Sequence, residues 1–138
     1  MTYFLDTNIC IYYLNGTSDS VAEKLNALGF TDVKIPSMVA AELYYGAEKS
    51  GKREQNRAVS EKFLSLYEIV PFEERAAEHY AKIRAELERG GQLIGNNDIV
   101  IAATALAFGG VLVTHNTGEF SRVDGLAIED WVEPPTRG

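Results

Sequence analysis

Short apolar runs alternate with helical patterns along this chain, and this alternation restricts the fold more than any other feature. Between the runs, apolar residues recur at helical spacing. Strands are expected at residues 2–5, 33–35, 67–70, 111–113 and 126–128, and helices at residues 8–14, 19–28, 38–49, 53–66, 73–89 and 96–108. Strands that alternate with helices build a parallel sheet covered on both faces. The sequence therefore predicts an α/β fold with a central parallel sheet of about four or five short strands.

Capping residues and apolar stripes indicate where the helices end and which faces they bury. Ser37 is expected to cap the helix at 38–49, and Gly29 to close the helix at 19–28. The helix at 96–108 is apolar on every side, which predicts a central, buried position. Buried stripes are expected on two further helices, from Val59, Phe63 and Leu66 on one and from Ala76, Tyr80, Ile83 and Leu87 on the other.

Length and cysteine content favour a small intracellular protein. The 138 residues fit a single domain spanning residues 1–138. No run of about 18 apolar residues is present, so a membrane span is not expected. The chain begins with a strand-like run instead of a signal peptide. Its single cysteine, Cys10, excludes an internal disulfide framework and a cysteine-rich zinc site, so a cytoplasmic location is expected.

The charge of the chain is unevenly distributed. The net charge of −7 argues against indiscriminate binding to polyanions. Residues 49–62, however, carry five basic residues against two acidic ones, a local charge of +3. This basic segment could contact the phosphates of a nucleic acid, or it could be an ordinary solvated helix face. The sequence leaves both readings open.

Several carboxylates lie in or next to apolar segments of the sequence, where a charged side chain is unexpected. Asp6 ends the first apolar run, Glu42 lies within the apolar stretch 38–45, and Asp98 is the only charge between residues 96 and 108. Asn116 and Glu119 follow the apolar run at 111–113. Carboxylates near apolar surface are costly unless they are paired, hydrogen-bonded or bound to a cation. Together they predict one metal-binding acidic pocket.

The expected fold brings these residues to one edge of the sheet. Sites in open α/β sheets form at the carboxyl ends of the strands. Asp6 follows the first strand, and Asn116 and Glu119 follow the strand at 111–113. Asp98 lies in the first turn of its helix, where the helix dipole favours a negative charge. The helix neighbours of Glu42 are apolar, so its side chain is expected to point inward or into a cleft.

Each of these residues also has a purely structural reading. Asp6 could simply cap a helix, Glu42 could form a salt bridge on a helix surface, and Asp98 could complement the helix dipole. Thr7 could orient Asp6, contact a metal-bound water or act as a cap. Ser37 is a second candidate near the substrate, although an N-cap explains it better than a catalytic hydroxyl does.

Oxygen ligands of this kind suit a hard divalent cation. Mg²⁺ is typically held by one or two carboxylates, keeps several waters and completes its shell with substrate phosphates. Such a site can activate water and stabilise the charge that develops in a phosphodiester displacement. The chain has no phosphate-binding glycine loop, no Gly-x-Ser-x-Gly elbow and no His/Cys zinc pattern.

Four motifs in order resemble the PIN-domain nucleases, and specifically the VapC-type toxins of bacterial toxin–antitoxin pairs. The motifs are FLDTN at 4–8, PSMVAAELYYG at 36–46, IGNNDIVIAA at 94–103 and VTHNTGEF at 113–120, and the ending GLAIEDW at 125–131 also fits. Each motif alone is weak, but four at this spacing are specific, and the resemblance covers essentially the whole chain.

The resemblance implies a PIN-like fold and a toxin that cleaves RNA with Mg²⁺, or with Mn²⁺ as a substitute. Asp6, Glu42 and Asp98 match the three core acidic positions of the family. The fourth position falls near Asn116, where this chain has an amide, and Glu119 is expected to supply the carboxylate. The usual second residue of the Thr-Asn-Asn motif is His115 here, so its participation stays open. A VapB-like antitoxin, a homodimer and a heterotetramer or larger assembly with the antitoxin are also implied.

The combined interpretation is an endoribonuclease in which Asp6, Asp98 and Glu42 bind or complete the metal shell and Asn116 and Glu119 position it. Basic residues of the segment 49–62 would steer the RNA backbone. One rival is a phosphatase with Asp6 as the nucleophile, although such sites want a second aspartate two residues later. Another rival is a binding module without catalytic activity. The RNA target cannot be read from the sequence.

Overall fold

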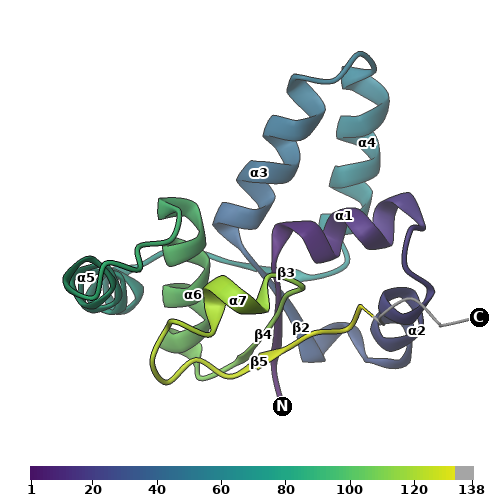
Figure 1. The fold of residues 1–138 in the computed structure, drawn as a ribbon. Coiled ribbons are helices and arrows are strands. Elements are labelled where there is room, and N and C mark those ends of the chain that lie inside the picture. The colour runs from purple at the N-terminus through teal and green to yellow at the C-terminus, as the bar shows by residue number, and fades with distance from the viewer. Residues whose placement is uncertain (133–138) are drawn as a thin grey trace, which may run out of the picture.

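The computed structural model describes residues 1–132, and within this range strands and helices alternate as the sequence predicts (Figure 1). The elements are β1 Tyr3–Leu5, α1 Thr7–Asn15, α2 Asp19–Ala27, a 3₁₀ turn η1 Phe30–Asp32, β2 Val33–Pro36, α3 Ser37–Glu48, α4 Arg53–Leu64, β3 Glu68–Val70, α5 Glu74–Arg89, α6 Asn96–Phe108, β4 Val111–Val113, α7 Thr117–Phe120 and β5 Ile128–Glu129.

The five strands form one parallel sheet in the order β3-β2-β1-β4-β5. β1 is central, and Phe4, Leu5 and Leu112 on β1 and β4 are completely buried. In Figure 1 the helices α5 and α6 lie to one side of the sheet, and α1 and α2 lie to the other. Parallel strands need cover on both faces, because both faces are apolar. The predicted fold class is thus confirmed.

The helix at 96–108 is central, as its apolar sequence predicts. α6 contacts β2, β4, α3 and α5, and its residues from Ile101 to Ala105 are all buried. It ends at Gly109, whose φ of 66° is in the left-handed region that favours glycine. No helix in residues 1–132 is long and apolar enough to cross a membrane.

Two predicted caps are wrong, and in each case the neighbouring backbone explains why. Pro36 is the last residue of β2 and is paired with Val70. Pro36 is also the N-cap residue of α3. Ser37 is therefore the first helical residue, and no side-chain bond caps this helix. Gly29 does not cap α2, whose last helical residue is Ala27 and whose cap residue is Leu28. It begins η1 instead, where its amide donates to Asp32 Oδ2 at 3.2 Å.

The predicted buried face of α4 is only partly correct. Phe63 is 4% exposed, but Val59 is 50% exposed and Leu66 is 47% exposed. Ser60 and Leu64 are the other buried residues of α4. The helix ends at Leu64, so Leu66 lies outside the periodicity used to predict the stripe. The stripe on α5 is confirmed for Ala76, Ile83 and Leu87, with Tyr80 partly buried, while the short helix α7 escaped prediction altogether.

We expect Gly110→Ala to destabilise the fold by about 1–3 kcal/mol, because this position is overpacked by any side chain. A Cβ at Gly110 would lie 2.5 Å from the Phe4 ring and 3.1 Å from the Thr2 carbonyl oxygen. Phe4 is fully buried and cannot move aside easily. Urea denaturation of both proteins measures the difference.

Gly46→Ala is the matched control, because nothing lies within 4 Å of a Cβ at this helical position. It should stabilise the protein by roughly 0.5–1 kcal/mol. Equal unfolding midpoints for the two variants would contradict the packing interpretation of Gly110.

Candidate active site

A polar cavity of about 120 Å³ opens at the carboxyl edge of the sheet. Residues from four separate regions line it: the β1–α1 junction, α3, the start of α6 and the segment after β4. The lining residues are Asp6, Thr7, Asn8, Glu42, Asp98, Asn116 and Phe120. Five of them were singled out from the sequence, so the fold brings these candidates together. Ser37 and Glu119 are not among the lining residues.

Asp6 is held by two hydrogen bonds at the centre of this site. Its Oδ1 accepts from the amide of Ile9 at 2.9 Å, and its Oδ2 accepts from the hydroxyl of Thr114 at 2.5 Å. β1 and β4 pair Leu5 with Val113, so Asp6 and Thr114 are the next residues on adjacent strands. Asp6 thus caps α1, as its structural reading proposes, and also lines the cavity.

The pKa of Asp6 is raised above its ordinary value. Burial is the main cause, since the side chain is only 5% exposed, and the charges of Glu42 and Asp130 add to it. The bonds from Thr114 and Ile9 oppose this shift by favouring the carboxylate. Asp6 is therefore a carboxylate kept in place by neutral donors next to other acids.

The Thr7 side chain orients Glu42. The sequence had suggested Asp6 as its partner. The Thr7 hydroxyl donates to Glu42 Oε1 at 2.6 Å and joins the start of α1 to α3. None of the salt bridges among residues 1–132 involves Glu42, which excludes the surface ion pair considered from the sequence. Glu42 Oε1 is thus engaged by a neutral donor at the edge of the cavity.

Asp98 is the most perturbed carboxylate of the cavity. Burial, followed by the charges of Glu119, Glu42 and Asp6, raises the pKa of Asp98 from 3.8 to about 6. A group whose charged form is disfavoured by burial and by three like charges is characteristic of a functional site. The start of α6 therefore carries a carboxylate that is costly for the fold.

Asn116 and Glu119 form one unit beside Asp98. The Asn116 side-chain amide donates to Glu119 Oε2 at 3.1 Å, and the Asn116 backbone amide donates to the Thr114 hydroxyl at 3.0 Å. Glu119 does not line the cavity, but it is the largest charged contribution to the Asp98 pKa. Asn116 lines the cavity together with the three carboxylates, and Glu119 bonds to the Asn116 side chain from outside the cavity.

Two of the five basic residues in the segment 49–62, Arg57 and Lys49, contact acidic or aromatic side chains. Arg57 pairs with Glu61 at 2.8 Å and with Glu48 at 3.5 Å, and its guanidinium lies 4.9 Å from the ring centre of Tyr44. Lys49 lies 5.1 Å from the ring centre of Tyr45. The solvated-face reading therefore describes Arg57 well, and the role in steering RNA stays a prediction.

Thr114, Asn8 and Phe120 belong to the site, although the sequence pattern assigned them no functional role. For Thr114 a signal was present, because it follows the run 111–113 just as Asp6 follows the first strand. Pairing those two strands in register would have placed its hydroxyl beside Asp6.

The donor set fits a hard divalent cation. All polar side chains that line the cavity offer oxygen, and three of them are carboxylates whose crowding a cation would relieve. Within residues 1–132, however, no three acidic, histidine or cysteine side chains form a ready metal cluster. Asp6 and Glu42 are each held by their own hydroxyl donor. Mg²⁺ needs only one or two carboxylates, so the fit remains good.

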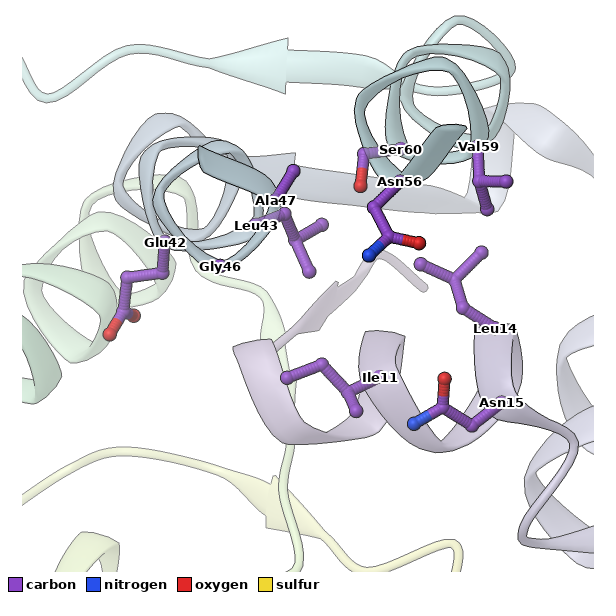
Figure 2. Close-up of a pocket in the computed structure, with 10 residues that line it drawn as sticks. All are labelled: Ile11, Leu14, Asn15, Glu42, Leu43, Gly46, Ala47, Asn56, Val59 and Ser60. Atoms are coloured by element: carbon purple, nitrogen blue, oxygen red, sulfur yellow. The ribbon is translucent and has the colours of Figure 1, made fainter. Parts of the chain in front are cut away.

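A second, apolar cavity of about 370 Å³ lies beside the first, between α1, α3 and α4 (Figure 2). We call it the apolar groove. Its apolar lining comes from Ile11 and Leu14 on α1, Leu43 and Ala47 on α3, and Val59 on α4, and its polar lining from Asn15, Glu42, Asn56 and Ser60. Glu42 lines both cavities, and Figure 2 shows it to the side of the α3 residues that face α1 and α4.

Comparison with known proteins gives a consistent result along the chain. Residues 3–126 match the family model of the PIN domain. The chain is 45% identical over 132 residues to ribonuclease VapC2 of Rickettsia felis, covering 95% of this chain and 98% of the relative. It is 44% identical over 131 residues to the tRNA(fMet)-specific endonuclease VapC of Shigella flexneri, with the same coverage.

Solved structures agree with the sequence relatives. The Rickettsia felis chain in a VapBC2 complex bound to a promoter DNA fragment has a TM-score of 0.89 and 44% identity, covering 95% of this chain and 99% of that one. A DNA-bound VapBC of Salmonella typhimurium has a TM-score of 0.89 and 41% identity, covering 95% and 98%.

We expect Asp98→Asn to raise the melting temperature at pH 7.5 by a few degrees. The folded-state pKa of about 6 lies above the ordinary 3.8, so the stability contributed by Asp98 is present below pH 4 and is lost as the pH rises through 6. The neutral variant does not suffer this loss, and the difference should close toward pH 4. Thermal unfolding between pH 4 and 7.5 in EDTA measures it.

Asp124→Asn, at an exposed acid outside the cavity, is the control and should show no such pH-dependent gain. If Asp98→Asn were instead less stable than the wild type at pH 7.5, Asp98 would be a structural residue.

Proposed function

This chain belongs to the PIN-domain family and to its VapC-type members, and on that premise we propose that it is a Mg²⁺-dependent endoribonuclease, the toxin of a VapBC-type toxin–antitoxin pair. The observation that carries the proposal is the cavity that joins Asp6, Glu42 and Asp98 at the carboxyl edge of the sheet. The names of the relatives, ribonuclease and endonuclease, support the substrate class.

Asp6 and Asp98 are the residues that would hold the cation directly, and Glu42 would complete its shell or hold a water. A bound Mg²⁺, or Mn²⁺ in its place, supplies charge stabilisation for the phosphodiester and lowers the pKa of a water molecule. Thr114 keeps the Asp6 carboxylate in one orientation through its bond to Oδ2. Such fixed orientation is what positions reacting groups productively.

Glu42 is the residue that would accept the proton of the attacking water. Thr7 donates to its Oε1, which leaves Oε2 to accept a proton as the water oxygen bonds to phosphorus. The bond from phosphorus to the leaving oxygen then breaks, that oxygen takes up a proton from bulk water, and Glu42 releases the proton it accepted to the solvent. Asn116, linked to Glu119, would hold the far side of the site.

The apolar groove would receive the antitoxin. Val59 is 50% exposed and Ile11 is 37% exposed, and both line the groove, so it presents apolar side chains to solvent. The solved relatives are complexes of VapC with VapB, so a segment of a VapB-like partner is the occupant we propose. Since Glu42 lines both cavities, such a segment would reach the active site. A homodimer, and a heterotetramer or larger assembly with the antitoxin, belong to the same proposal.

Purified protein should cleave RNA with Mg²⁺ and not with EDTA. The initiator tRNA is the first substrate to test, because the Shigella relative carries its name. Asp6→Asn, Glu42→Gln and Asp98→Asn should each lower the rate by on the order of 100-fold or more, the scale of a lost acid–base or positioning group. Thr7→Val should lower it less, since Glu42 remains but loses its orientation. Gel assays with labelled RNA measure the rates.

Cleavage that persists in EDTA or in Asp98→Asn would overturn the assignment. A phosphorylated Asp6 trapped with substrate would instead indicate the phosphatase, and absence of Mg²⁺ and Mn²⁺ binding in calorimetry would indicate a binding module without catalysis.

Val59→Asp should weaken binding of the antitoxin at least tenfold and leave RNA cleavage unchanged, because a charge buried against an apolar partner is costly. The antitoxin to use is the product of the neighbouring gene, and calorimetry measures the affinity. Leu66→Asp is the matched control, since Leu66 is similarly exposed but does not line the groove. Equal losses in both variants, or none in Val59→Asp, would exclude the groove as the docking site.

A further inference from the structure

A histidine–aspartate pair lies beside the acidic cavity and has no part in the proposed metal site. His115 Nδ1 lies 3.0 Å from Asp130 Oδ2. His115 stands between Thr114, which bonds to Asp6, and Asn116, which lines the cavity. The charge of Asp130 contributes to the raised pKa of Asp6, so the pair is close to the carboxylates.

The parallel pairing of β4 with β5 builds this pair. Val113 is in register with Glu129, and the Thr114 amide donates to the Glu129 carbonyl at 2.9 Å. The segments that follow β4 and β5 therefore leave the sheet side by side, which brings His115 to Asp130 at the same edge as the cavity. Asp130 is itself fixed, because its Oδ1 accepts from the Val132 amide at 2.9 Å.

The imidazole ring is oriented from two directions and still half exposed. Tyr12 meets it edge-on, with 6.2 Å between ring centres and 70° between ring planes, and Asp130 holds Nδ1. The side chain nevertheless remains 50% exposed. No group within residues 1–132 bonds to the other ring nitrogen, Nε2. An exposed histidine–carboxylate contact of this kind adds little to stability, so the fold alone gives no reason for it.

Within residues 1–132, the cavity lacks the positively charged side chains that bind a polyanion. Its lining includes three carboxylates and no basic side chain among the described residues. A nucleic acid backbone is held chiefly by cationic donors to its phosphates, so donors must stand at the rim. Arg57 of the basic segment is engaged by two glutamates. His115 can supply a charged donor immediately beside the carboxylates, because an imidazolium donates from both nitrogens.

We propose that His115 is a substrate-positioning residue that donates from Nε2 to a backbone phosphate of the RNA, while Asp130 accepts from Nδ1 and sets the ring orientation. The proposal rests on the proposed function for its ligand, RNA, but not on the catalytic roles of Asp6, Glu42 or Asp98. It assigns a function to the position where this chain departs from the Thr-Asn-Asn motif of the family it resembles.

The test measures binding separately from cleavage. A fluorescent single-stranded RNA of about 12 nucleotides, a length chosen to span roughly one site, is titrated with the full chain in EDTA at pH 6.0, and anisotropy gives the affinity at several salt concentrations. His115→Gln should weaken binding about tenfold, as expected for a charge-assisted hydrogen bond, and lower the salt slope by about 0.7. His115→Arg should restore both, because it keeps a charged donor.

Asp130→Asn separates positioning from bulk electrostatics. Removal of one negative charge from an acidic site would by itself strengthen RNA binding. If Asp130 orients His115, the variant should instead bind RNA several-fold more weakly. His79→Gln is the matched control, since it removes the other histidine of the chain, on α5. It should change neither affinity nor salt slope.

Unchanged binding in His115→Gln, or a stronger complex in Asp130→Asn, would overturn the proposal. A parallel assay of wild-type cleavage with Mg²⁺ keeps the two inferences apart. Cleavage without a binding defect in His115→Gln rejects only the positioning role. A binding defect without wild-type cleavage rejects only the proposed nuclease.

Discussion

The hydrogen bond between Asp6 and Thr114 is the interaction on which the rest of the site depends. It joins residues 108 positions apart, and it exists because β1 and β4 are adjacent and in register. A carboxylate that is 5% exposed would be costly without such donors, so the bond makes the central acid of the cavity tolerable. The same Thr114 hydroxyl accepts from the Asn116 backbone amide and thereby positions Asn116 in the site. One buried hydroxyl therefore connects the sheet register to the shape of the site.

Much of the fold and part of the site could be predicted from the sequence, because both follow from local patterns. The run 111–113 and the helix at 96–108 were predicted with their observed limits, since apolar content and the Gly109 end signal agree there. Asp6 and Asn116 were placed at one edge from strand ends alone. The errors arose where a neighbour overrode the local signal, as when Pro36 in β2 made Ser37 helical.

Other features depend on pairs distant in sequence, which no local pattern contains. Thr7 meets Glu42 across 35 positions and His115 meets Asp130 across 15, and both pairs form only after helices and strands have packed. The same holds for the apolar groove, whose walls come from three helices. Periodicity assigned Val59 to the core, whereas packing leaves it 50% exposed along that groove. An apolar residue in a helical stripe can serve the core or a partner, and its sequence position does not distinguish them.

The position of Glu42 in both cavities has an evolutionary consequence. If the groove receives the antitoxin and Glu42 acts in catalysis as proposed, the inhibitor recognises a residue that the enzyme could not replace without losing its own activity. Escape from inhibition through that contact would disarm the toxin in the same step. Divergence between toxin–antitoxin pairs in one cell would then concentrate on the apolar walls of the groove, where specificity can change while the carboxylate stays. Glu42 would serve as the constant part of recognition and the surrounding helices as the variable part.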